Sequence, residues 1–194
     1  MRINTKAMKV AILSMQQIKN YGSFLQAFSL KKNIESLGHT CEFINIIPGE
    51  QLEGYKTSCF YNIKLLFQRL WGWDFYKRFQ TIFVFQNRFR KEFLPYLGVK
   101  KGINTKHYDV VVIGSDEVFN CTQKTWFGFS SQLFGKGLNA SRIITYAASF
   151  GATTTDKLQL VGKKEIVSSL LHDLDAISVR DENSMKVIEE LTGK

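Results

Sequence analysis

The sequence predicts an α/β protein with a Rossmann-like open parallel sheet and flanking helices. Apolar runs at residues 8–13, 40–47 and 109–113 lack the alternation of half-exposed strands, which is typical of strands buried on both faces of a parallel sheet. Segments with helical spacing alternate with these runs along the chain. Hydrophobic residues make up 44% and charged residues 22% of the 194 residues, which excludes a disordered chain and fits one domain over residues 1–194.

The first predicted elements form a βαβ unit. A strand at 8–13 precedes a helix at 23–37, in which apolar residues recur near helical spacing and Gly38 stands at the position of a helix C-cap. A strand at 40–47, rich in β-branched residues, completes the unit. Its size predicts a right-handed crossover between parallel strands.

The second half of the chain continues the alternation. Its strongest strand signal is the run DVVVI at 109–113, which is followed by a loop that begins at Gly114. Further elements are predicted as strands at 142–147 and 176–179 and as helices at 156–171 and 182–191, the last closed by Gly193.

Residues 55–101 form a basic aromatic segment between two predicted strands. Ten basic residues face two acidic ones, a net charge of +8 out of the chain's +9, and 14 of the 26 aromatic residues lie here. We expect an insertion of two helices, broken near Gly72 and ended near Pro95. Two interpretations stay open: aromatics packed inward under solvated cations, or a surface for anionic lipid headgroups and a lipid-linked glycan.

The cysteines and the apolar runs indicate a cytoplasmic protein. Cys41, Cys59 and Cys121 are too widely spaced for a closed disulfide framework or a zinc site. The first apolar run is shorter than the ~7–15 residues of a signal peptide, and no run reaches the ~18–20 residues of a membrane span. Localisation is therefore expected to be cytoplasmic, with peripheral contact at the inner membrane face as the functional interpretation of the basic aromatic segment.

Polar residues follow four of the predicted strands. In an open parallel sheet, ligands bind outside the carboxyl ends of the strands, so we expect these residues to line one crevice. Gly22 permits close backbone approach, and the helix N-terminus after Asn20 offers N–H groups to an anion. Asp116 is the candidate catalytic residue. The candidate substrate-binding residues are Asn20, Tyr21, Gly22, Gln26, Gly114, Ser115, Glu117, Asn120, Ser149, Phe150, Gly151 and Arg180.

Each of these residues also has a structural interpretation. Gly22 can simply form a turn, Asp116 can cap a helix, and Arg180 with Asp181 can form a surface ion pair. An arginine in a crevice would instead suit a carboxylate or a phosphate. The residues alone leave these alternatives open.

Several common site signatures are absent from the sequence. It lacks G-x-G-x-x-G, a correctly spaced P-loop, G-x-S-x-G and H-E-x-x-H, so dinucleotide, P-loop and serine hydrolase functions have little support. His39, His107 and His172 lie far apart in polar contexts, and we predict no metal site.

Four longer segments occur in a fixed order. They are NYGSFLQAF at 20–28, YDVVVIGSDEVFN at 108–120, YAASFG at 146–151 and ISVRD at 177–181. Together they resemble the N-terminal half of polysaccharide pyruvyl transferases, and the resemblance covers nearly the whole chain. It implies a GT-B-like architecture of two Rossmann-like domains, with a C-terminal domain, absent from this chain, that supplies part of the donor site.

The resemblance also implies a reaction in polysaccharide or exopolysaccharide biosynthesis. A pyruvyl group would pass from phosphoenolpyruvate, the donor substrate, to two hydroxyls of a glycan or lipid-linked oligosaccharide as a cyclic ketal, with no cofactor. Asp116 would activate or bind a hydroxyl, Arg180 and the helix N-terminus after Asn20 would contact an anion, and Tyr21 and Gln26 would orient groups. The family commonly has Gln and Trp where this chain has Glu117 and Phe119.

Two other functions are alternatives. A GT-B sugar-nucleotide glycosyltransferase would share the fold, because its donor site usually lies in the C-terminal domain. A non-catalytic basic module would use the basic aromatic segment, but that segment has no recognisable nucleic-acid motif, so no nucleic acid partner is expected.

Overall fold

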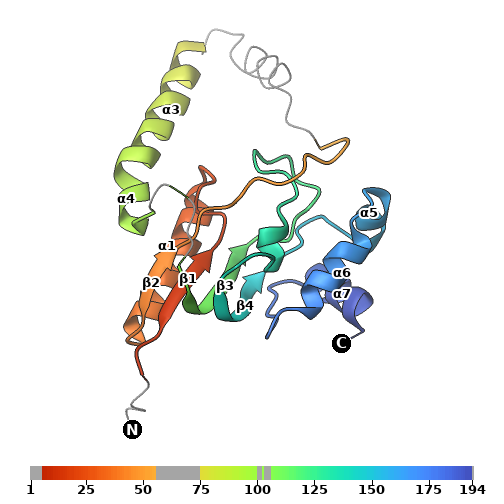
Figure 1. Ribbon diagram of the computed structural model, residues 1–194. Helices are drawn as coiled ribbons and strands as arrows, with labels where there is room; N and C mark the ends of the chain where they lie inside the picture. The colour runs from red at the N-terminus through yellow and green to blue at the C-terminus, as the bar shows by residue number, and fades with distance from the viewer. Residues whose placement is uncertain (1–5, 56–74, 100–101, 103–105, 194) are drawn as a thin grey trace.

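The computed structural model describes residues 6–55, 75–99, 102 and 106–193. Four parallel strands form one sheet in the spatial order β2-β1-β3-β4, with β1 and β3 at its centre (Figure 1). The strands are β1 (Lys9–Leu13), β2 (Thr40–Phe43), β3 (Tyr108–Asp116) and β4 (Ala140–Ala148). Because every strand pair is parallel and helices flank the sheet, the predicted Rossmann-like α/β fold is confirmed.

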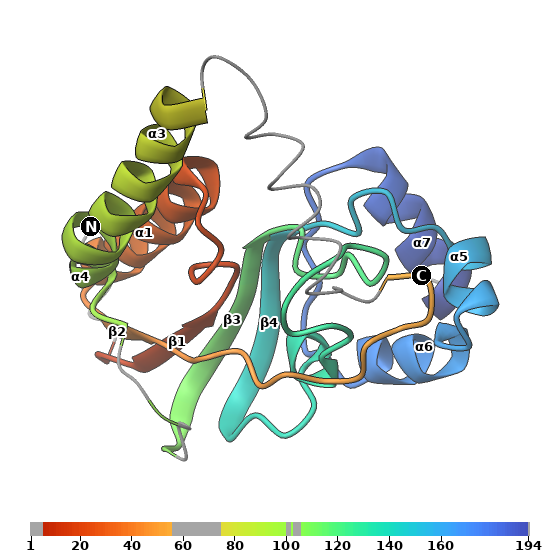
Figure 2. The ribbon, with the colours of Figure 1, turned by 90° about the horizontal axis from the view of Figure 1, so that it is seen from above.

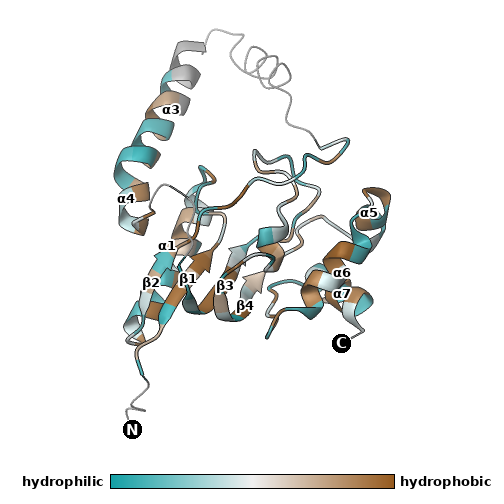
Figure 3. Ribbon diagram, in the orientation of Figure 1, coloured by the Kyte–Doolittle hydropathy of each residue, from teal (hydrophilic) through white to brown (hydrophobic). Residues whose placement is uncertain are grey.

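The two central strands are apolar on both faces. Val10 lies opposite Cys41 on one side and Val110 on the other, and Ile12, Val111 and Ile113 are almost fully buried. Figure 3 shows these strands as the most hydrophobic part of the ribbon. Burial on both faces explains why their sequences do not alternate.

Helix α1 (Tyr21–Ser36) covers one face of the sheet (Figure 2). It begins two residues before the predicted start, because the Asn20 side chain accepts a hydrogen bond from the Gly22 N–H at 2.7 Å and so caps the helix. Gly38, with a φ of 89°, follows the C-cap residue as predicted. The buried residues of α1 pack on the β1 and β3 side chains, which fixes the helix beside the carboxyl ends of the strands.

Three helices cover the other face: α5 (Thr155–Leu160), α6 (Lys164–His172) and α7 (Glu182–Thr192). The single helix predicted at 156–171 is wrong, because the chain turns at Gly162, which has a φ of 64°, between α5 and α6. Helix α7 ends at the left-handed Gly193, as predicted. The core under these helices contains four stacked or tilted phenylalanines and the short 3-10 helix η2 (Ser131–Phe134).

Two predicted strands differ from the structure. Strand β2 ends at Phe43 rather than at residue 47, because the Ile47 N–H donates to the Gln132 side chain and not to a strand. Residues 176–179 form only isolated bridges to β4. The Thr145 hydroxyl replaces ladder hydrogen bonds here, since it accepts from the Ser178 N–H and donates to the Ser178 carbonyl.

The described part of the basic aromatic segment is a helical arm. Helix α3 (Phe75–Arg88) continues through a π-helical turn, η1 (Phe89–Phe93), into α4 (Leu94–Leu97) (Figure 1). The helix ends at Leu97, two residues after Pro95, which confirms the prediction of an end near that proline. Gly98, with a φ of 67°, ends it. The break predicted near Gly72 lies outside the described residues.

Three aromatic residues of this arm, Phe85, Phe89 and Phe93, pack inward. Phe89 is buried, and Phe85, Phe89 and Phe93 contact rings of α1. Phe83 is 58% exposed, and the cations Arg88, Arg90 and Lys91 are exposed as well. Among the described helices, none has the length and apolar content that crossing a bilayer requires.

Candidate active site

The carboxyl edge of the sheet brings three distant segments together around Arg180. Its Nη2 atom lies 3.6 Å from Asp116 Oδ1, at the end of β3, and 3.8 Å from Glu117 Oε1. Its Nη1 atom lies 3.5 Å from Oε1 of Gln26 on α1. We call Ser23, Gln26, Asp116, Glu117 and Arg180 the Arg180 cluster. The parallel sheet explains this meeting, because all its strands end at the same edge.

Asp116 is the most connected residue of the Arg180 cluster. Its Oδ2 atom accepts a hydrogen bond from the Ser23 hydroxyl at 2.5 Å, and its Oδ1 atom accepts from the Glu117 N–H at 2.9 Å. Its φ is 91°, a conformation that non-glycine residues seldom adopt and that is common at functional sites. The side chain keeps 16% of its surface exposed, so a ligand hydroxyl can still reach the carboxylate.

Ser23 was not among the predicted site residues. Ser23 and Gln26 are three residues apart on α1, so both lie on the helix face that meets the strand ends. This spacing was the sequence signal from which Ser23 could have been predicted as a site residue. It places the first turn of α1 directly against the Asp116 carboxylate, where the positive end of the helix dipole stabilises a negative charge.

The backbone below Asp116 is tightly packed. Gly114 has a φ of 121°, and a Cβ atom at this position would lie 2.3 Å from the Tyr146 carbonyl oxygen. The Ser14 hydroxyl donates to the Ser115 carbonyl at 2.9 Å, and the Ser14 N–H donates to the buried side chain of Gln16. Gly114 and Ser115 therefore support the cluster through their backbone, and Ser115 itself is only 8% exposed.

Glu117 connects the Arg180 cluster to the loop that follows β4. Its Oε2 atom accepts from Asn120 Nδ2 at 2.7 Å, and the Thr153 hydroxyl holds the Asn120 oxygen at 2.9 Å. Gly151 lies against the same pair, because a Cβ atom there would be 2.5 Å from Glu117 Oε2. Three predicted site residues, Glu117, Asn120 and Gly151, are thus neighbours.

Ser149 is linked to Arg180 through Asp181, which bonds Ser149 and lies beside the Arg180 charge. Asp181 caps α7 by accepting from the N–H and the hydroxyl of Ser184, each at 2.8 Å. Partial burial alone would raise the pKa of Asp181, but hydrogen bonds from Ser149 and Ser184 and the neighbouring Arg180 charge outweigh it, so the pKa is lowered below the usual 3.8. The Asp that precedes a predicted helix was a sequence signal for this cap.

Nine of the thirteen predicted site residues lie outside the Arg180 cluster; five of them are described above, and the other four are Asn20, Tyr21, Gly22 and Phe150. Asn20 is the N-cap residue of α1, and Gly22, in the first turn of the helix, donates its N–H to the Asn20 side chain. The Tyr21 ring packs on Phe85 and Phe93, with centroid distances of 4.9 and 5.2 Å. Phe150 is fully buried in the core beside other phenylalanines, so its side chain cannot meet a substrate in this structure.

The charges of the Arg180 cluster nearly balance. One guanidinium lies between two carboxylates, and the Asp116 carboxylate already faces the start of α1. The predicted crevice is not the cavity of about 550 Å³ described below, which has no lining residue in common with the cluster. The cluster therefore favours neutral hydroxyl groups as ligands. A donor substrate with two or more negative charges would need further cations.

Other kinds of site are not formed by the described residues. Within these ranges no three His, Cys, Asp or Glu side chains gather as a metal ion would require. Burial is the main cause that raises the pKa values of Cys41 and Cys121 to about 12, which keeps both thiols protonated and unreactive.

Comparison with known proteins places the chain in a family. No curated protein and no solved structure matches the chain. The family described as polysaccharide pyruvyl transferase matches residues 20–194, a stretch that begins at the N-cap of α1 and includes every residue of the Arg180 cluster. Since this match spans far more than half of the sequence, the chain belongs to the polysaccharide pyruvyl transferase family.

Proposed function

We propose that this chain takes part in the transfer of a pyruvyl group from phosphoenolpyruvate to two hydroxyls of a sugar. The product is a cyclic pyruvate ketal, and inorganic phosphate leaves. The observation that carries the proposal is the Arg180 cluster, in which a partly exposed carboxylate and a guanidinium lie 3.6 Å apart at the carboxyl edge of the sheet. Membership of the pyruvyl transferase family supports the same reaction.

The reaction balances without a redox partner. Protonation of the methylene carbon of phosphoenolpyruvate gives an oxocarbenium-like centre, and the first sugar hydroxyl forms a C–O bond to it. The second hydroxyl then forms the other C–O bond while the C–O bond to phosphate breaks. Of the two hydroxyl protons, one equivalent ends on the new methyl group and the other on phosphate, so the site needs an acid and a base.

Within this chain, Asp116 is the candidate base and acceptor-binding group. Its carboxylate is held by Ser23 and Glu117, which leaves its orientation fixed before a sugar arrives. Glu117 and Gln26 lie within reach of the same guanidinium and would bind neighbouring hydroxyls. Arg180 would contact the pyruvyl carboxylate, whose planar shape suits the guanidinium fork.

The donor phosphate requires cations beyond Arg180. Asp116 and Glu117 already offset the Arg180 charge, so the described cluster does not carry the positive excess that phosphoenolpyruvate demands. The C-terminal domain expected from the family resemblance would supply these cations and the acid for the methylene carbon. In this proposal, the described domain binds the acceptor hydroxyls, and the expected C-terminal domain supplies most of the positive charge that binds the donor.

The substitution Asp116→Asn tests the proposal. We expect it to lower kcat in the full-length protein by about 10²–10³-fold, because the amide cannot take the hydroxyl proton. Phosphate release would be measured with phosphoenolpyruvate and a panel of hexose and N-acetylhexosamine glycosides. Glu189→Gln, an exposed change on α7, is the matched control and should be silent. Unchanged turnover in Asp116→Asn would remove Asp116 from the mechanism.

The runner-up function is transfer of a sugar from a nucleotide donor. Thermal stabilisation of the full-length protein by phosphoenolpyruvate, compared with UDP-hexoses, separates the two. Stabilisation by nucleotide sugars alone would replace the pyruvyl donor with a glycosyl donor.

A further inference from the structure

A cavity of about 550 Å³ lies away from the Arg180 cluster. The loop that leaves β2 (residues 44–48) forms one wall, and the segments that lead into β3 and β4 form the others. We call this cavity the amide cavity. Tyr108, at the start of β3, lines it, whereas Asp116 ends the same strand about 25 Å away at the usual rise per residue.

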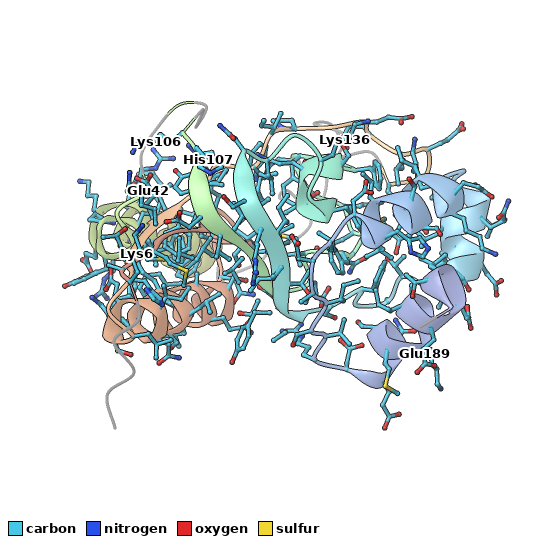
Figure 4. All side chains as sticks on the ribbon, turned by 60° about the horizontal axis from the view of Figure 1, so that its bottom comes forward. Lys6, Glu42, Lys106, His107, Lys136 and Glu189 are labelled. Carbon is cyan, nitrogen blue, oxygen red and sulfur yellow. The ribbon has the colours of Figure 1, made fainter. Side chains whose placement is uncertain are left out.

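The lining of the amide cavity is polar but uncharged on most sides. Four carboxamide side chains contribute to it, and none of the described residues that line it is an Asp or a Glu. Among the described residues that line it, Lys106 is the one cation, and it pairs with Glu42 at 3.0 Å beside the cavity. Figure 4 shows Lys106 and His107 next to Glu42 at the amino edge of the sheet. This chemistry disfavours phosphates and nucleotides, which need several unpaired cations.

Two of these carboxamides have one end fixed by the protein and the other end unused. The Gln132 oxygen accepts from the Ile47 N–H at 2.9 Å, and its NH₂ group has no partner among the described residues although the residue is 7% exposed. The Gln17 NH₂ group donates to Asn45 at 2.7 Å, and its oxygen has no partner among the same residues. A spare donor and a spare acceptor on fixed side chains suit hydroxyl groups, which donate and accept at once.

An exposed indole completes the lining. Trp126 keeps 48% of its surface exposed, an unusual state for a large aromatic residue. Its ring packs edge-on against the buried Phe127, with centroids 5.4 Å apart, and its carbonyl accepts from the Gln51 side chain. A flat aromatic face held in this way can pack against the C–H face of a sugar ring.

The loop wall is fixed before any ligand binds. Gln16, which is fully buried, donates to the Ile44 carbonyl at 2.8 Å. The Ser130 hydroxyl donates to the Ile47 carbonyl at 2.7 Å, and the Ile47 N–H donates to Gln132. A preformed wall spares a ligand the entropy cost of ordering it.

We propose that the amide cavity is a second carbohydrate site, which binds a neutral saccharide of two to four units. Its volume lies within the roughly 300–1,000 Å³ of small-molecule pockets. The proposal goes beyond pyruvyl transfer, because it rests on Trp126, Gln17 and Gln132 and on none of the Arg180 cluster. The site holds part of a glycan chain that is remote from the reacting hydroxyls.

The test is binding of neutral di- to tetrasaccharides of hexose and N-acetylhexosamine to the full-length protein, followed by calorimetry and ligand-observed NMR. At least one saccharide should bind at millimolar concentration. Trp126→Ala should weaken it by about tenfold, and Gln132→Glu, which keeps an acceptor for Ile47, should weaken it by about fivefold. Tyr96→Ala, which removes a 68% exposed ring elsewhere, should change the affinity less than twofold.

Four results would overturn the second carbohydrate site. They are no binding by any saccharide of the panel, binding that Trp126→Ala leaves unchanged, binding that Asp116→Asn abolishes, and displacement of the saccharide by UMP at lower concentration. Loss of turnover in Asp116→Asn with intact saccharide binding would support both proposals, whereas turnover without saccharide binding would reject only this one.

Discussion

The Arg180 cluster and the amide cavity use polar side chains in opposite ways. In the cluster, charged groups at the ends of the sheet elements pair with each other, and their distances to Arg180 are 3.6 and 3.8 Å. In the amide cavity, Gln17 and Gln132 each use one end of the carboxamide to bond the protein and leave the other end for a ligand. The paired charges of the cluster can stabilise charge that develops on a substrate during a reaction. The amides of the cavity can bind neutral hydroxyl groups, which donate and accept hydrogen bonds.

The two regions are connected by one buried residue. Gln16 accepts from the Ser14 N–H, next to the hydroxyl that holds Ser115 below the cluster, and donates to the Ile44 carbonyl in the cavity wall. The comparison therefore teaches that a shared backbone framework positions both regions, whereas their exposed side chains differ. Substitutions in the framework should affect both regions, and substitutions at the surface only one.

The largest expected effect is on the framework below the Arg180 cluster. Gly114→Ala should lower the free energy of unfolding by at least about 3 kcal/mol, because its Cβ would lie 2.3 Å from the Tyr146 oxygen at a φ of 121°. Gly38→Ala, at a φ of 89° with open space, is the matched control and should cost about 1 kcal/mol. Urea unfolding measures both, and equal costs would contradict the close packing.

The next effect tests whether Gln16 connects the Arg180 cluster and the amide cavity. Gln16→Met should cost about 2–3 kcal/mol, because the Ser14 N–H and the Ile44 carbonyl lose their partner inside the protein. Gln17→Met, at the half-buried neighbouring position, should cost less than about 1 kcal/mol. Amide hydrogen exchange should then rise in both the loop at 44–48 and the end of β3. Faster exchange in only one of these segments would contradict the connection of the two regions through Gln16.

A smaller effect concerns pH and the charge balance of the cluster. The pKa of Asp181 is lowered by folding, so its contribution to stability is present above pH 3.8 and is lost as the pH falls through the folded value. Asp181→Asn should be less stable than wild type by up to about 1 kcal/mol at pH 7, and the difference should vanish in that acid range. Glu189→Gln on the same helix controls for net charge. A constant difference down to pH 2 would contradict this cause.

The last expected effect concerns contact between the helical arm and a membrane surface. Arg90 and Lys91 are exposed on the helical arm near the exposed Phe83. If the arm contacts anionic lipid, Arg90→Gln with Lys91→Gln should weaken cosedimentation with phosphatidylglycerol vesicles by about fivefold per cation. Lys186→Gln on α7 is the control. Absence of binding by the wild type would favour the interpretation of solvated cations.

Sequence patterns predicted the regular parts of the fold better than its exceptions. The apolar run at 109–113 and the spacing of α1 reflect burial that repeats along each element, so both were correct. The strand predicted at 176–179 is reduced to isolated bridges, because the Thr145 hydroxyl bonds the Ser178 N–H and carbonyl in place of backbone groups. No local sequence pattern indicates such a side-chain contact. The helix end predicted near Pro95 was also correct, because the helix ends at Leu97.

The candidate site was predicted in part for a similar reason. Asp116, Glu117, Gln26 and Arg180 meet because parallel strands end at one edge, which the topology implies. Phe150 was assigned to the site from its motif, but it lies in the core. The amide cavity was not predicted, because its walls come from loops whose contacts depend on three-dimensional packing.

The amino-acid sequence by itself determined the alternation of strands and helices and the order of the polar segments, since each depends on residues close together in the chain. Only the tertiary structure decided that Ser23 holds Asp116, that two carboxylates offset Arg180, and that amides enclose a cavity away from the Arg180 cluster. These pairings join residues 60 or more positions apart in most cases, for example 93 for Ser23 and Asp116. No local pattern encodes such distances, because they follow from how whole elements pack.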